Sequence, residues 1–127
     1  MSRTAARITQ ADVARAKSEG KTFIYFLRAG DFVKIGRSKN WRYRMAGMQV
    51  GSPYTIVPLL VLIGDEREER KLHHRFRASH FRGEWFHLGP AIREYIKGSL
   101  SLCVAKTDVS DLRTPNKWED SKEEIIL

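Results

Sequence analysis

Two short apolar runs that lie close together constrain this 127-residue chain more than any other feature. Residues 23–27 and 32–35 are rich in aromatic and β-branched side chains, and four residues that include Gly30 and Asp31 separate them. Runs of this composition joined by a short Gly/Asp linker predict a β-hairpin. The hairpin carries two polar side chains, Tyr25 and Lys34, in otherwise apolar strands.

A helix is predicted directly after the hairpin, over residues 37–49. Trp41, Met45 and Met48 are spaced i, i+4, i+7, which gives the helix one apolar face. Arg44 comes three residues after Trp41, at the margin of that face. A guanidinium in this position either extends to solvent along its own stem or is held facing a site.

A second long helix is predicted over residues 66–79, with acidic residues in its first turn and basic ones in its last, as the helix dipole favours. Its inward face is defined by Leu72 and Phe76, and Glu69 falls on the same line. A carboxylate on an inward face is costly to bury unless it finds a cation. One interpretation of Glu69 is therefore a structural salt bridge, for example to Arg44.

The run over residues 54–63 predicts a strand buried on both faces of a sheet. Pro58 interrupts it and favours a bulge, an edge position or a late start at Leu59. The aromatic-rich stretch 80–88 predicts a turn and a short strand, with Trp85 and Phe86 closing the core.

The remaining elements are a short helix over residues 9–20, capped by Thr9, and a last helix over residues 91–97. The predicted organisation is an N-terminal helical extension (1–20), one main domain (21–98) and an acidic tail (99–127).

Charge is distributed unevenly along the chain. The net charge is +8, with nineteen Lys/Arg against nine Asp/Glu in residues 1–99 and four against six in residues 100–127. A basic body of this kind favours a polyanion such as nucleic acid as partner, although a solvated basic surface without a partner has the same composition. The acidic tail, with Trp118 and Ile125-Ile126, could instead dock on a protein.

Membrane and secretory classes are not indicated. The longest apolar run, residues 56–63, is far shorter than the roughly 20 residues of a membrane span. The first seven residues contain no apolar core of a signal peptide. The single cysteine, Cys103, excludes an internal disulfide and a multi-cysteine zinc site. We therefore expect a cytoplasmic protein with no membrane partner.

Five short motifs occur in order between residues 23 and 88. They are Phe23-Ile24-Tyr25, Lys34-Ile35-Gly36 with Arg44 eight residues later, Gly51-Ser52-Pro53, Glu69-x-x-Leu72-His73-x-x-Phe76 and Gly83-Glu84-Trp85-Phe86. Together they resemble the GIY-YIG nuclease domain, in particular the small phage and prophage branch with the meiotically-up-regulated-gene-type GIY-YIG domain. No single motif is specific, but their order and spacing are.

This resemblance implies an α/β (α+β) fold, with a small three-stranded, mainly antiparallel sheet flanked by helices. It also implies metal-dependent hydrolysis of DNA phosphodiester bonds. Tyr25 would help to activate the attacking water, and Arg44 would neutralise the scissile phosphate. Glu69 would bind one divalent cation, Mg²⁺ or Mn²⁺. These implied roles agree with the inward position of Glu69 and the marginal position of Arg44.

The chain departs from the family pattern at Lys34, which replaces the second motif tyrosine. A lysine there could pair with the phosphate or lower the pKa of Tyr25 through its charge. The family's late asparagine has no clear match, and the nearest polar candidates are Glu84 and His80. His73 is either a partner of the site or a solvated side chain.

The nucleic-acid-binding candidates are basic or imidazole side chains on the two long helices and the hairpin end: Arg37, Lys39, Arg42, His73 and Arg75. Such residues would serve equally in the alternative function, a non-catalytic nucleic-acid-binding module on the same fold, used in phage or prophage regulation. DNA is the expected partner, with RNA left open. A homodimer would allow both strands to be cut.

Overall fold

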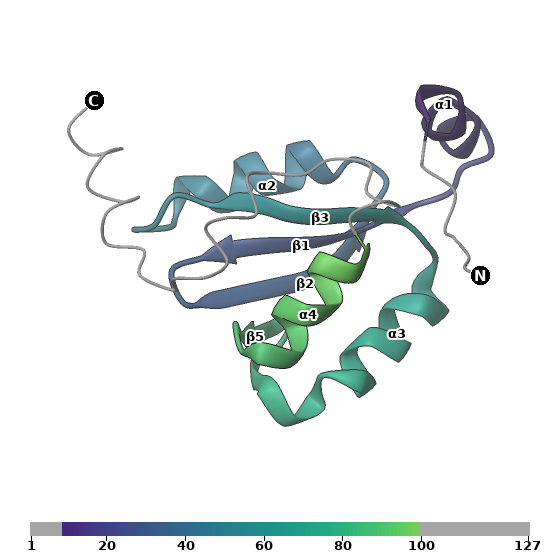
Figure 1. Cartoon of the computed structure of the whole chain (residues 1–127). Coiled ribbons are helices and arrows are strands. Elements are labelled where there is room, and N and C mark those ends of the chain that lie inside the picture. Colours follow the sequence, from purple (N-terminus) through teal and green to yellow (C-terminus); the bar gives the residue numbers. More distant parts are fainter. Residues whose placement is uncertain (1–8, 100–127) are drawn as a thin grey trace.

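The computed structural model describes residues 9–99, which form one antiparallel sheet with helices on both faces (Figure 1). The strand order is β3-β1-β2-β5-β4. The strands are β1 (Phe23–Ala29), β2 (Phe32–Ser38), β3 (Val57–Ile63), β4 (His80–Arg82) and β5 (Trp85–His87). The helices are α1 (Gln10–Ser18), α2 (Trp41–Val50), α3 (Glu66–Arg75) and α4 (Pro90–Ser99), with a 3₁₀ turn at Arg77–Ser79.

The predicted α+β class is confirmed, but the sheet has five strands where three were expected. The additional pair is a hairpin of β4 and β5, in a stretch predicted as a turn and one short strand. Gly83, with φ 55°, reverses the chain between them, a conformation that glycine adopts readily. β5 then pairs with β2, so the short hairpin extends the sheet beyond the central strands.

The predicted hairpin of β1 and β2 is confirmed. The two strands pair from Phe23–Ser38 to Ala29–Phe32, which leaves a two-residue loop. Gly30 has φ 66°, and no non-glycine residue among those described has a positive φ. This is the pattern of a type II′ turn, whose twist matches that of the flanking strands.

Of the alternatives for the third strand, the edge position and the bulge indicated by Pro58 are confirmed, and the strand buried on both faces is β1. All seven residues of β1 are buried, whereas β3 lies at an edge of the sheet. Pro58 sits where the β1–β3 register shifts, between Phe26 and Leu27. Because proline has no N–H to donate, it is tolerated at an edge or a bulge, and here it occupies both.

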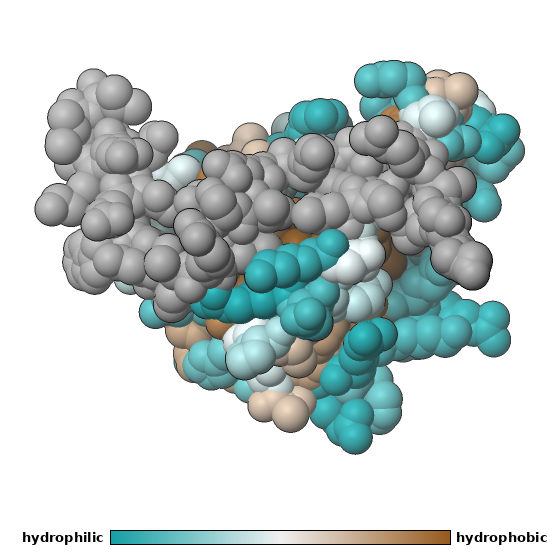
Figure 2. Space-filling model, in the orientation of Figure 1, coloured by the Kyte–Doolittle hydropathy of each residue, from teal (hydrophilic) through white to brown (hydrophobic). Residues whose placement is uncertain are grey.

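Two hydrophobic clusters pack on opposite faces of the sheet. One contains Leu72 and Phe76 from the end of α3 together with Ile92 and Ile96 of α4. The other contains Tyr25 of β1 with the inward residues of α2 and Ala16 of α1. On the face that carries α3 and α4, exposed atoms are mostly hydrophilic, and apolar atoms are visible between the elements (Figure 2). Tyr25 and α3 therefore belong to different layers of the protein.

The helix ends follow local chemistry. The Thr9 hydroxyl accepts from the Asp12 N–H and the Asp12 carboxylate accepts from the Thr9 N–H, so the predicted cap of α1 is confirmed. Asp65 and Glu68 form the same reciprocal arrangement at α3. The second long helix was predicted to continue to residue 79. It ends at Arg75, and the chain tightens into the 3₁₀ turn. The predicted acidic tail lies, beyond Ser99, outside the described residues.

Candidate active site

Tyr25 is held against a glycine. Tyr25 and Gly36 are direct partners across the β1–β2 ladder, and the Tyr25 side chain is fully buried. A Cβ atom on Gly36 would lie 2.5 Å from Tyr25 Oη and 2.6 Å from Cζ. The phenol therefore lies across the bare backbone of Gly36, and only glycine leaves room for it. This contact explains why a glycine follows Ile35 in the second strand.

The hydroxyl of Tyr25 is a buried polar group without a partner. Among residues 9–99, no group accepts from or donates to Tyr25 Oη in hydrogen-bond geometry. An unpaired buried hydroxyl of this kind is uncommon in native proteins and costs free energy. Its presence in the middle of the sheet therefore needs an explanation beyond packing.

Three charged side chains act on this phenol. Burial is the main cause that raises the pKa of Tyr25 above its usual value, and the carboxylate of Glu84 raises it further. The Arg44 guanidinium lies close enough to lower that pKa, though outside hydrogen-bonding geometry, and Glu69 adds a smaller upward effect. The structure thus brings together the predicted residues Tyr25, Arg44 and Glu69, and it adds Glu84.

Glu69 reaches this place from the opposite layer. Only 14 % of its side chain is exposed, and its Oε1 lies 3.3 Å from Nε of Arg37. Its Oε2 lies 3.7 Å from Nε2 of His73. The interpretation of Glu69 as a member of a salt bridge is therefore confirmed, with Arg37 as the partner where Arg44 had been given as an example. Arg37 is nearer because it belongs to β2, the strand against which α3 packs.

The end of β2 allows the two layers to meet. β5 pairs with β2 only from Phe32 to Lys34, so the later residues of β2 extend past it. His73 Nε2 lies 2.8 Å from the carbonyl oxygen of Ile35. A carbonyl can only accept, so Nε2 carries the proton and donates. His73 thus fixes α3 beside the bare part of β2 at Gly36, and its role here is positional.

Lys34 lies on the same face as Tyr25 and pairs with Glu84. Lys34 Nζ is 3.7 Å from Glu84 Oε1 and 5.6 Å from the centre of the Trp85 ring. Sequence reasoning gave Glu84 only as one of two candidates for a late polar residue. Glu84 directly precedes β5, next to Trp85, the ladder partner of Lys34. The sequence signal for it is its place in the Gly83-Glu84-Trp85-Phe86 motif.

The match to a known family comes from residues 22–105, which fit the model of the T5orf172 domain. This match spans about two thirds of the 127-residue chain. The chain belongs to the T5orf172 domain family. This family is phage-associated. No curated protein and no solved structure matches the chain.

The T5orf172 domain carries a group of cations at the start of α2. Lys39 and Arg42, both predicted to bind nucleic acid, line a hollow of about 180 Å³ together with Lys17 of α1. The Arg42 guanidinium lies 4.6 Å from the centre of the Trp41 ring, which orients it. Sequence reasoning missed Lys17. It belongs to α1, and no pattern in the sequence indicated that α1 lies beside the start of α2.

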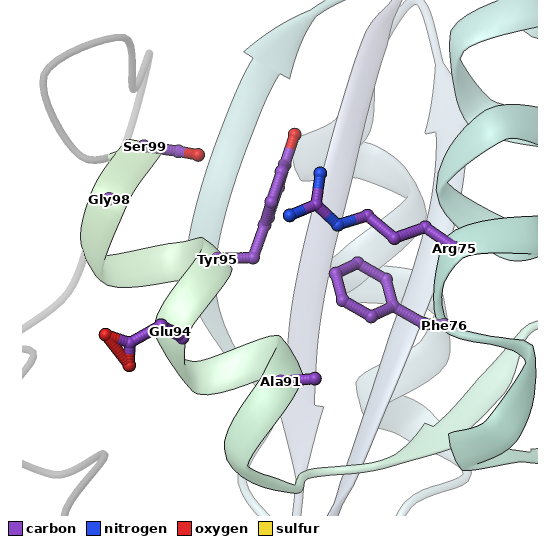
Figure 3. Close-up of a pocket in the computed structure, with 7 residues that line it drawn as sticks. All are labelled: Arg75, Phe76, Ala91, Glu94, Tyr95, Gly98 and Ser99. Atoms are coloured by element: carbon purple, nitrogen blue, oxygen red, sulfur yellow. The ribbon is translucent and has the colours of Figure 1, made fainter.

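Arg75 does not join this group. It extends from α3 toward α4, with its guanidinium 4.9 Å from the centre of the Tyr95 ring and 5.6 Å from that of Phe76 (Figure 3). These residues line a groove of about 530 Å³ on the face opposite α2. Arg75 and Arg42 therefore lie on opposite faces of the sheet, and nucleic-acid binding by Arg75 stays a prediction.

A divalent cation fits this site only if most of its ligands are waters or substrate oxygens. Within residues 9–99, no three His, Cys, Asp or Glu side chains gather into a metal-binding group. Mg²⁺, however, often keeps several waters and binds through one or two carboxylates plus substrate phosphates. The partly exposed carboxylate of Glu69, near an unpartnered phenol, suits that kind of ligand set.

The described part of the chain contains no helix that is long and apolar enough to span a membrane.

Proposed function

We propose that this chain is a metal-dependent endonuclease that hydrolyses DNA phosphodiester bonds at a GIY-YIG-type site. The observation that carries the proposal is the Tyr25 hydroxyl, which is buried, unpartnered and subject to the charges of Arg44, Glu69 and Glu84. Because this hydroxyl has no protein partner among the described residues, it can hydrogen-bond a water or substrate oxygen once one reaches it. The ordered motifs and the basic body of the chain support the same function.

Each residue has a role suited to its position. Arg44 is exposed on α2 and can pair with the scissile phosphate, because a guanidinium matches phosphate oxygens in geometry and charge. Tyr25 would hydrogen-bond the attacking water and orient it. Glu69 would hold one Mg²⁺ or Mn²⁺ ion, which when bound supplies charge stabilisation at the leaving oxygen.

The raised pKa of Tyr25 determines how it can act. At neutral pH the phenol is protonated, so it orients a water as a hydrogen-bond partner and does not start as a base. Two carboxylates, Glu84 and Glu69, contribute to that raised pKa. Lys34 already offsets Glu84 by pairing with it, and neutralisation of Glu69 would offset the other. A smaller contribution from either carboxylate would lower the pKa of Tyr25 from its raised value and so make loss of the phenol proton easier.

The cations around the start of α2 supply the surface for the DNA backbone. Lys17, Lys39 and Arg42 come from two elements and lie around one hollow. Neutralising phosphates with such residues releases counterions, so binding should weaken steeply as salt rises. Each of these cations that contacts phosphate should contribute about one to the salt slope.

The test is nicking of supercoiled and branched DNA in the presence of Mg²⁺ or Mn²⁺, with Glu69→Ala as the inactive variant. Glu66→Ala is the matched control, because Glu66 lies on the same helix with 66 % of its side chain exposed. We expect the wild type and Glu66→Ala to nick DNA and Glu69→Ala to lose activity. No nicking by the wild type under any condition, or equal nicking by Glu69→Ala, would reject the proposal.

One observation favours a second function, a nucleic-acid-binding module without catalysis. Arg37 already occupies one oxygen of Glu69, as in a structural salt bridge. In that case the protein binds DNA equally well with and without EDTA, and never cleaves it. Binding measured by fluorescence anisotropy in both conditions, beside the nicking assay, separates the two functions.

A further inference from the structure

A groove lined by aromatic side chains opens on the α2 face of the sheet. It has a volume of about 590 Å³ and lies between the end of α2, the segment before β3 and the β4–β5 hairpin. Four rings from four different places in the sequence line it: Phe32, Tyr54, Phe81 and Trp85.

The groove combines fixed walls with one exposed ring. Tyr54 packs on the turn of the central hairpin, where a Cβ atom on Gly30 would lie 3.3 Å from its ring. Trp85 packs against the cluster that contains Tyr25. Phe81 is 49 % exposed, and its ring centre lies 4.7 Å from that of Phe32. A large aromatic side chain left half in solvent at a groove is a common sign of a binding surface.

Two cations border the same groove. Lys34 and Arg82 both line it, and the Arg82 guanidinium lies 5.7 Å from the centre of the Phe81 ring. No Asp or Glu side chain is among the residues that line it. The Glu84 carboxylate lies next to the groove, 3.7 Å from Lys34 Nζ, so Arg82 is the cation that would meet an anion there. Aromatic faces beside a cation suit a flat ring system attached to an anion.

Lys34 connects the groove to the candidate active site. Lys34 and Gly36 lie on one face of β2, two residues apart, which corresponds to roughly 7 Å along a strand. The Tyr25 phenol lies across Gly36. The groove therefore lies close enough to the candidate active site for one nucleotide to span both. The base would lie in the groove, and its phosphate would lie beside Arg44 and Tyr25.

We propose that this groove receives one unpaired nucleobase of the nucleic-acid substrate, beside the phosphate at the Tyr25 site. The inference rests on the proposed function for the position of that phosphate. Stacking on aromatic rings needs the faces of the base to be free, so the preferred substrate has a single-stranded, bulged or branched nucleotide at this place. The four rings supply the stacking surface, and Arg82 neutralises a flanking phosphate.

The groove can be filled without disturbing the fold. Gly47 lines it from α2, and a Cβ atom on Gly47 would meet no other atom within 4 Å. Gly47→Leu should therefore occupy the groove and leave the protein folded. Ala46→Leu is the matched control, since Ala46 is the exposed neighbour on the same helix and does not line the groove.

The experiment uses the full chain in EDTA, so that no cleavage occurs. The probes are two DNA hairpins that each carry one unpaired nucleotide, either the fluorescent base 2-aminopurine or an abasic sugar at the same place. For the wild type and Ala46→Leu we expect quenched 2-aminopurine fluorescence on binding. We also expect the base-containing hairpin to bind about 5- to 150-fold more tightly than the abasic one, the range that stacking of one base gives. Gly47→Leu should abolish both the quenching and the preference.

Unchanged quenching and preference in Gly47→Leu, with the variant shown to be folded by its circular dichroism spectrum, would overturn the inference. Equal affinity of the wild type for both hairpins would also overturn the inference. The groove would then be a site for a ligand of another class, such as a peptide. These results do not depend on nicking. Absence of nicking with the base preference intact would reject the endonuclease and keep the base site. Nicking without any base preference would keep the endonuclease and reject the base site.

Discussion

Replacing Tyr25 by phenylalanine should make the protein more stable and inactive. The Tyr25 hydroxyl is buried with no hydrogen-bond partner among the described residues. Leaving such a group unsatisfied costs about 1–3 kcal/mol, and phenylalanine removes the oxygen while keeping the ring. The space left is smaller than a methyl group, whose loss would cost about 1 kcal/mol. We therefore expect a net gain of about 1–2 kcal/mol in the free energy of unfolding.

The measurement is equilibrium urea unfolding followed by tryptophan fluorescence. Trp41 and Trp85 both pack in the cluster that contains Tyr25, so their emission reports on the relevant core. For a domain of this size, a gain of 1 kcal/mol corresponds to a rise of about 4–8 °C in Tm. Tyr43→Phe is the control, because Tyr43 is 75 % exposed and its hydroxyl should contribute within about 0.5 kcal/mol. A Tyr25→Phe variant that is less stable than wild type would refute the reasoning, since the hydroxyl would then be satisfied in the folded protein.

Three further predictions concern the same site. Gly36→Ala should destabilise the protein by about 1–3 kcal/mol and stop cleavage, because its Cβ would lie 2.5 Å from Tyr25 Oη. Its control is Gly47→Ala, where the added Cβ meets open space, and which should stabilise the protein by about 0.5–1 kcal/mol in the same urea assay. The raised pKa of Tyr25 means that the unfolded chain loses this proton first, so the free energy of unfolding should fall as pH rises above about 10, and Tyr25→Phe should lack that component in unfolding curves recorded from pH 8 to 11. Arg37→Gln should free one oxygen of Glu69 and tighten Mn²⁺ binding by up to about fivefold in a calorimetric titration, and unchanged affinity would place the cation elsewhere.

Local patterns predicted most of the elements, because each pattern depended on near neighbours in the chain. The central hairpin follows from two apolar runs and a glycine with φ 66° between them. The caps of α1 and α3 follow from a polar side chain and an acid three residues later. The order of the strands in the sheet was harder to predict from the sequence. Pro58 indicated an edge or a bulge for the third strand, but the choice was settled only by pairing with β1, far away in the sequence.

The candidate site was predictable in its members but not in its pairings. Periodicity singled out Glu69 on the inward face of α3, and the structure places its side chain largely buried there. Its partner could not be inferred, because Arg37 lies on a strand and the helix pattern says nothing about strand side chains. The surroundings of Arg75 could not be inferred for a similar reason: helical spacing cannot tell which face of the sheet a helix covers, and Arg75 lies against Tyr95 of α4.

The position of Lys34 shows how a departure from the motif can be accommodated by its neighbours. In a strand, Lys34 and Gly36 share one face, so Lys34 lies on the face where the Tyr25 phenol crosses Gly36. Alone, this cation would lower the pKa of the phenol. It is instead directed to Glu84, the carboxylate that raises the pKa of Tyr25 most. Lys34 thus pairs with Glu84, and Arg44 is the cation whose charge lowers the pKa of the phenol. A phosphate that approaches the site is therefore drawn toward Arg44, the place where the proposed reaction requires it.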